Sequence, residues 1–194
     1  MAGIDETIVR EFFEANGFLV RQLNKYQVQS RKKRADEEID LVAENPRAKE
    51  GAVPDSFVLR PEDLRNVGRA AVAVRGWHTG VFSVATMKSA GGIFNFLQKS
   101  AIARIENLLG SEGRIFKILA IPALPKNAVE REKSVQYLKS RGIDGVLTYP
   151  IMLRNIASVV EVNNNYVKSD LLQTLRILKN YDMLSDPQTD MFEK

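Results

Sequence analysis

The stretch Glu37-Glu38-Ile39-Asp40-Leu41-Val42-Ala43 alternates acidic and apolar residues before it becomes apolar throughout. Such alternation is typical of a β-strand, in which successive side chains point to opposite faces of the sheet. Ile39 and Leu41 are therefore expected on one face of this strand, with Glu38 and Asp40 on the other. Two carboxylates on one face repel each other, so the pattern predicts a positive partner, either a divalent cation or an arginine.

A second strand pattern lies at residues 71–77, which read Ala-Val-Ala-Val-Arg-Gly-Trp. Val72 and Val74 are expected to share one face, which places Ala73 and Arg75 on the opposite face. If the two strands pair with their polar faces together, the side chains on those faces become neighbours. The two stretches then predict one small patch, formed by Glu38, Asp40, Ala73 and Arg75.

The segment Glu38-Ile39-Asp40-Leu41-Val42-Ala43 resembles the acidic strand motif of the PD-(D/E)XK nuclease superfamily, which includes restriction enzymes and archaeal-type Holliday junction resolvases. The preceding patterns resemble that family's core as well, since a helix containing Glu6 and a strand from Phe18 come before the motif. The family carries Glu-x-Lys on its next strand, where this chain has Ala73-Val74-Arg75. The resemblance therefore implies a restriction endonuclease-like α/β fold with a degenerate active site.

For an active member of this family, the resemblance implies Asp40 and Glu38 as ligands of Mg²⁺ or Mn²⁺, cations that prefer oxygen ligands. Glu6, on the opening helix, would supply a further carboxylate. Arg75 and Lys88 would supply positive charge beside the reacting phosphate. The chain is then expected to be a metal-dependent endonuclease with displaced catalytic residues.

The residues of the second strand favour a protein that has lost its metal site. Ala73 carries a methyl group, which ligates no metal, and Arg75 cannot accept a proton because it stays protonated at all working pH values. Without a metal, Arg75 is expected to form a salt bridge to Asp40. The favoured hypothesis is therefore a nuclease-fold protein with a decayed metal site, retained as a nucleic-acid-binding or assembly module.

A run of basic residues precedes the acidic strand, with no acidic residue between positions 21 and 34. Such a run either binds a phosphate backbone through counterion release or forms a solvated loop. Together with His78, it predicts a surface for nucleic acid, with DNA favoured. The residues of this predicted surface are Arg21, Lys25, Tyr26, Arg31, Lys32, Lys33, Arg34 and His78.

Trp77 and His78, at the end of the second strand pattern, each have alternative interpretations. His78 is the single histidine of the chain and cannot build a zinc site alone, so a hydrogen-bonded structural role is favoured over contact with phosphate. Trp77 is expected in the core rather than as a platform on which a base stacks.

The remaining patterns predict strands alternating with helices, and hence an α/β protein with a central mixed sheet flanked by helices. One domain is expected over residues 1–183, with an insertion at 46–68 that forms a lid, an interface or an extra strand, and a polar tail at 184–194. The expected helices are 4–16, 93–109, 128–141, 151–159 and 167–183, and a single helical turn is expected at 61–64. The expected strands are 18–23, 38–43, 57–59, 114–121 and 143–149, besides the one at 71–77.

Composition favours a soluble globular protein, with 44% hydrophobic and 27% charged residues. No apolar run reaches the length of a membrane span, the first residues lack the profile of a secretion signal, and cysteine is absent, so a cytoplasmic location without a membrane partner is expected. A third hypothesis is an oligomeric scaffold without a nucleic-acid role, a homodimer through the helix expected at 167–183.

Overall fold

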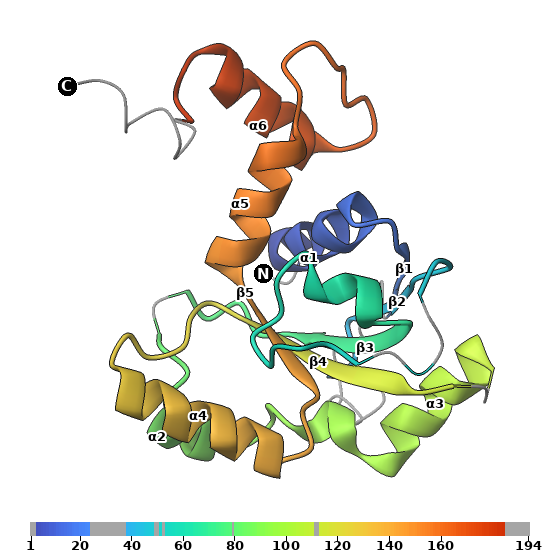
Figure 1. Ribbon diagram of the computed structural model, residues 1–194, viewed down its shortest axis with the longest axis vertical. Helices are drawn as coiled ribbons and strands as arrows, with labels where there is room; N and C mark the ends of the chain where they lie inside the picture. The colour runs from blue at the N-terminus through green and yellow to red at the C-terminus, as the bar shows by residue number, and fades with distance from the viewer. Residues whose placement is uncertain are drawn as a thin grey trace, which may run out of the picture.

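The computed structural model describes residues 3–23, 38–48, 51, 53–78, 80–110 and 113–184. A five-stranded sheet in the order β1-β2-β3-β4-β5 lies at its centre, with helices on both faces (Figure 1). The pairs β1–β2 and β2–β3 are antiparallel, whereas the pairs β3–β4 and β4–β5 are parallel. These strands are β1 (Leu19–Gln22), β2 (Leu41–Glu44), β3 (Arg69–Val74), β4 (Ile115–Ile121) and β5 (Gly145–Thr148). The predicted α/β class with a mixed central sheet is confirmed.

One face of the sheet is covered by α1 (Gly3–Ala15) and α5 (Tyr149–Val159), with α6 (Asp170–Asn180) packed beyond them (Figure 1). Apolar side chains of α1 and α5 meet the sheet there in what we call the first core cluster. It includes Val9, Phe12, Phe13, Leu41, Val72, Ile118, Met152 and Ile156. Burial of these side chains removes apolar area from water and holds both helices on the sheet.

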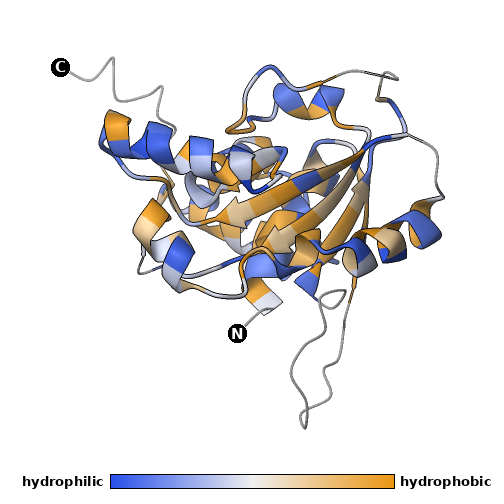
Figure 2. Ribbon diagram, turned by 90° about the horizontal axis from the view of Figure 1, so that it is seen from below, coloured by the Kyte–Doolittle hydropathy of each residue, from blue (hydrophilic) through white to orange (hydrophobic). Residues whose placement is uncertain are grey.

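The opposite face is covered by α2 (Val84–Ser89), α3 (Lys99–Leu109) and α4 (Ala128–Ser140). Their apolar side chains meet the sheet in the second core cluster, which includes Ile39, Val42, Ala73, Phe82, Met87, Ile105, Leu119 and Leu138. In Figure 2 the strands are largely hydrophobic, whereas the helices carry both hydrophobic and hydrophilic residues. Strands β2 to β5 are therefore largely buried on both faces, as expected where parallel strands are connected by helices, whereas the edge strand β1 is exposed.

The helix that opens the chain ends as its sequence predicts. Gly17 adopts a positive φ of 85°, which favours glycine. The Phe18 N–H then donates to the Phe13 carbonyl at 3.1 Å and closes the last turn. The turn directs the chain into β1, so the predicted helix 4–16 and strand 18–23 are both confirmed, the helix one residue earlier at both ends and the strand one residue shorter at each end.

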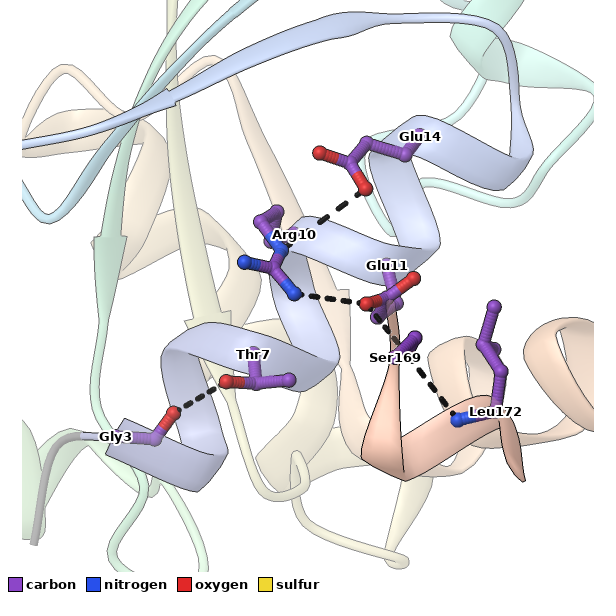
Figure 3. A network of polar contacts seen from close by, with 7 residues as sticks. All are labelled: Gly3, Thr7, Arg10, Glu11, Glu14, Ser169 and Leu172. Atoms are coloured by element: carbon purple, nitrogen blue, oxygen red, sulfur yellow. Dashed lines mark hydrogen bonds and ion pairs between the residues drawn. The ribbon is translucent and has the colours of Figure 1, made fainter. Parts of the chain in front are cut away.

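Helix α6 is anchored to α1 by a short polar network (Figure 3). The Ser169 hydroxyl donates to Glu11 Oε1 at 2.7 Å and accepts from the Leu172 N–H at 3.3 Å, which caps the helix. Arg10 Nη2 donates to the same Glu11 oxygen at 2.8 Å. The helix expected at 167–183 is therefore shorter than predicted, because Ser169 caps its start and Tyr181 ends it.

The helix expected at 93–109 is interrupted. A 3-10 turn, η3 (Asn95–Leu97), precedes α3, and Gln98 between them is extended with ψ 149°. Sequence periodicity also missed α2, which begins where the Ser83 hydroxyl accepts a hydrogen bond from the Thr86 N–H.

The segment expected to be an insertion contributes to the core. Val58 forms a parallel bridge to Val146 of β5, and the Leu59 N–H donates to the Val146 carbonyl at 2.8 Å. The 3-10 turn η2 (Asp63–Asn66) follows, close to the predicted helical turn at 61–64. Leu59 and Leu64 are buried in the first core cluster, so this part of the segment belongs to the core beside β5.

Candidate functional site

Arg75 follows β3 directly and lies between two carboxylates. Its Nη2 is 3.2 Å from Glu38 Oε2, and its Nη1 is 3.3 Å from Asp40 Oδ2. Nη1 also donates to the Val74 carbonyl at 2.9 Å. The predicted salt bridge between Arg75 and Asp40 is confirmed, and Glu38 joins it. Because Arg75 and Asp40 are buried, the charges are weakly screened by solvent.

Asp40 is held in place by the backbone of β3. Its Oδ2 accepts a hydrogen bond from the Val74 N–H at 2.7 Å, and its own N–H donates to the Val72 carbonyl at 3.0 Å. Leu41 is the register partner of the same Val72. Two residues therefore lie opposite one, which is the arrangement of a β-bulge.

This bulge corrects the predicted alternation. Ile39 and Leu41 were expected on one face, but Ile39 lies in the second core cluster and Leu41 in the first. The regular strand begins only at Leu41, and one extra residue before it moves the earlier side chains to the other face. As a result, the Asp40 carboxylate reaches both Arg75 and the β3 backbone.

Ala73 does not line the patch that the sequence predicts. It is fully buried among the apolar side chains of the second core cluster, whereas Val72 and Val74 pack on the first cluster as expected. The predicted patch of four residues is therefore reduced to three: Glu38, Asp40 and Arg75.

A second polar group lies at the same end of the sheet. The His78 Nε2 and Asp5 Oδ1 are 2.7 Å apart, which confirms the hydrogen-bonded role predicted for His78. The His78 ring also meets the Tyr149 ring edge-on, with centroids 4.5 Å apart. Residues from the start of α1, the end of β3 and the start of α5 are therefore in contact.

The Tyr149 hydroxyl is buried and makes no hydrogen bond of regular geometry with any described residue. Burial raises the pKa of the Tyr149 phenol well above its ordinary value, and the charge of the neighbouring Asp5 raises this pKa further. Asp40 and Glu6 add smaller effects in the same direction. Glu6, which was predicted as a catalytic carboxylate, therefore lies close enough to Tyr149 for its charge to affect the phenol.

Lys88 and Trp77 lie on the side of the sheet covered by α2 and α4. The Lys88 Nζ is 5.9 Å from the centre of the Tyr137 ring in α4, so its ammonium group faces that helix. Trp77 is 45% exposed and stacks on Phe82. The expectation that Trp77 belongs to the core is therefore wrong, because nearly half of the residue is exposed although its ring stacks on the buried Phe82.

Of the basic run, the structure describes Arg21, which is exposed on the edge strand β1. The other predicted nucleic-acid contacts lie outside the described residues: Lys25, Tyr26, Arg31, Lys32, Lys33 and Arg34.

The Mg²⁺ or Mn²⁺ site implied by the family resemblance does not fit this geometry. The guanidinium of Arg75 stands between the two carboxylates that would bind the cation, and Ala73 offers no ligand. Across the part of the chain that the structure describes, three or more His, Cys, Asp or Glu side chains nowhere gather in a way that could hold a metal ion. The described helices also include none that is long and apolar enough to cross a membrane.

Sequence patterns missed the roles of Asp5 and Tyr149. One signal was available: Tyr149 directly follows β5, and Arg75 directly follows the parallel strand β3. The carboxyl ends of parallel strands meet at one edge of a sheet, where α/β proteins usually bind ligands.

Comparison of the chain with protein families, with curated proteins and with solved structures found no match.

Proposed function

We propose that this protein has a nuclease-like fold of the PD-(D/E)XK type, that Arg75 takes the place of its metal ion, and that it binds nucleic acid without cleaving it. The observation that carries the proposal is the Arg75 guanidinium, 3.2 Å from Glu38 and 3.3 Å from Asp40. The order helix, three antiparallel strands, helices and parallel strand supports the fold, since the family's core has the same order.

The salt bridges of Arg75 to Glu38 and Asp40, which we call the arginine bridge, argue against hydrolysis. Cleavage of a phosphodiester needs an activated water and positive charge at the developing phosphorane. Here the positive charge of Arg75 is already engaged by two carboxylates, and its guanidinium cannot accept a proton from water. Arg75 therefore links the end of β3 to Glu38 and Asp40, and its guanidinium offers no base for the reaction.

The basic run supports the binding part of the proposal. Arg21 is exposed on β1, and the Leu23 N–H donates to the Asp40 carbonyl at 2.9 Å. The chain between Leu23 and Glu38 therefore begins and ends beside the arginine bridge, and it carries five basic residues. Lysine and arginine side chains in such a run bind phosphates by releasing counterions.

The binding experiment is fluorescence polarisation of a short labelled DNA at several salt concentrations. Affinity should fall steeply between about 50 and 200 mM salt, as it does when several phosphates are neutralised. A variant with Arg31, Lys32, Lys33 and Arg34 changed to serine should bind more weakly, with a shallower salt dependence. The matched control removes the same charge elsewhere, at Lys99, Lys133, Arg154 and Lys168, and should bind like the wild type.

A cleavage assay on the same DNA with Mg²⁺ and then Mn²⁺ completes the test. The proposal expects intact DNA in both. Manganese-dependent nicking that disappears in Asp40→Ala would contradict it and would identify a working endonuclease. If neither DNA nor RNA binds at low salt, the binding proposal is wrong, and the scaffold hypothesis gains support.

A further inference from the structure

Trp77 is the single tryptophan of the chain, and it lies in the loop between β3 and α2. Its ring stacks on Phe82 with centroids 5.5 Å apart and an angle of 21° between the planes. Phe82 is fully buried, and its N–H donates to the Ala123 carbonyl at 3.0 Å. Phe82 therefore supports the Trp77 ring from the core, while 45% of Trp77 is exposed to solvent.

Two exposed basic residues lie on the loop and helix that follow β4, to which the Phe82 backbone is hydrogen-bonded. The loop that follows β4 contains Ala123, the partner of Phe82, and continues through Pro125 to the exposed Lys126. The Arg131 Nε donates to the Pro125 carbonyl at 3.0 Å, which ties this exposed side chain of α4 to the same loop. Trp77 and these two cations therefore lie on segments that the hydrogen bond between Phe82 and Ala123 joins.

We propose that Trp77 is a stacking site for an unpaired nucleobase, with Lys126 and Arg131 contacting the adjoining phosphates. This inference rests on the nucleic-acid binding proposed above and adds a ligand class: a single strand, or a duplex with an unpaired base. Single-stranded nucleic acids are bound by this combination of aromatic rings and cations, because every base has a face on which a ring can stack.

The support beneath Trp77 favours a base as its ligand. Aromatic rings prefer offset stacking, and the Trp77–Phe82 pair already adopts a nearly parallel arrangement that a base stacked on Trp77 would extend. In an intact duplex the faces of the bases are covered by their neighbours, so a continuous duplex offers this ring no partner. The site therefore distinguishes unpaired from paired nucleic acid.

The single tryptophan makes the test direct. Intrinsic fluorescence is recorded while a thymidine homopolymer is added, and then while a duplex of equal length is added. Saturable quenching is expected with the single strand and not with the duplex. In parallel, polarisation of labelled strands gives affinities that do not depend on Trp77 as a reporter.

Trp77→Ala should weaken single-strand binding by about 5- to 150-fold while leaving duplex binding unchanged. Trp77→Phe should retain part of the affinity, because a smaller ring still stacks. Val81→Ala is the matched control, since Val81 is exposed in the same loop, and it should bind like the wild type. Circular dichroism of each variant shows whether the fold is retained.

The outcomes separate this inference from the function on which it rests. The first outcome is that single strands bind the wild type without quenching its fluorescence and bind Trp77→Ala and Trp77→Phe equally tightly. In that case the stacking site is wrong and nucleic-acid binding stands. Equal losses for single strand and duplex in folded variants would also overturn the stacking site. If no nucleic acid binds at all, both proposals are wrong.

Discussion

The carboxylate of Asp5 lies where a Cβ on Gly76 would be, so the start of α1 and the end of β3 touch without room for a side chain. This contact places Asp5 beside His78, two residues further along, and beside Tyr149 of α5. The absence of a side chain at position 76 therefore allows three elements to meet next to the arginine bridge.

Gly76→Ala should lower the free energy of unfolding by about 1–3 kcal/mol, because the new methyl group forces the Asp5 carboxylate away from His78. Urea denaturation followed by circular dichroism measures this change. Gly91→Ala is the control, since no atom lies within 4 Å of a Cβ built there, and its effect should be small. Equal effects of the two substitutions would show that Asp5 moves aside at no cost.

Removing Arg75 should be strongly destabilising, because it leaves two carboxylates without their cation in a largely buried site. Arg75→Ala is expected to cost about 3–5 kcal/mol. In a double-mutant cycle with Asp40→Asn, the double variant should lose less than the sum of the single losses, by about 0.5–3 kcal/mol. The exposed pair formed by Lys133 and Glu130 at 2.9 Å is the comparison, with an expected coupling of about 0–1 kcal/mol. Additive effects at Arg75 and Asp40 would contradict the bridge.

Tyr149 should affect stability mainly at alkaline pH. Its raised pKa means that the folded state favours the neutral phenol. This contribution is present in full below the ordinary pKa of about 10 and is lost as the pH rises above that value. Tyr149→Phe removes a buried hydroxyl without a regular hydrogen bond, so it should leave stability nearly unchanged at pH 8 and improve it at pH 11, relative to the wild type.

Guanidinium denaturation of both proteins across this pH range provides the measurement. Absorbance at 295 nm supplies an independent check, since one of the five tyrosines should ionise only when the protein unfolds. A marked loss of stability in Tyr149→Phe at neutral pH would show that the hydroxyl makes an important bond to Asp5.

Ala73→Glu tests whether position 73 faces the core or the site. Because Ala73 is fully buried among apolar side chains, a carboxylate there should cost several kcal/mol, about 2–7 for an uncompensated polar group. Thermal unfolding of Ala73→Glu, alone and combined with Arg75→Lys, gives the answer. A stable double variant that nicks DNA with Mn²⁺ would instead place position 73 at the site and support nuclease ancestry.

The sequence predicted most of the fold because its signals are local. Ile8, Val9, Phe12 and Phe13 repeat at helical spacing, and all four are buried as expected. Glycine at position 17 ended the first helix where predicted. The arginine bridge could also be predicted from the sequence, because carboxylates on the polar face of a strand require a positive partner.

Other features depend on contacts that no local pattern contains. The bulge at Asp40 arises from pairing with β3, so strict alternation assigned Ile39 to the wrong face. Asp5 and Tyr149 lie far apart in the sequence, and the role of Asp5 is invisible in the residues next to it. Trp77 carries an apolar side chain that usually lies in cores, and only the tertiary structure shows it exposed on Phe82.

The central claim, that Arg75 stands where a metal ion would bind, is tested most directly by crystals grown with Mn²⁺ and measured at an energy at which manganese scatters anomalously. The account predicts no anomalous peak beside Asp40 and a guanidinium within hydrogen-bonding distance of Asp40 and Glu38. A manganese peak coordinated by these two carboxylates, with Arg75 displaced, would contradict it.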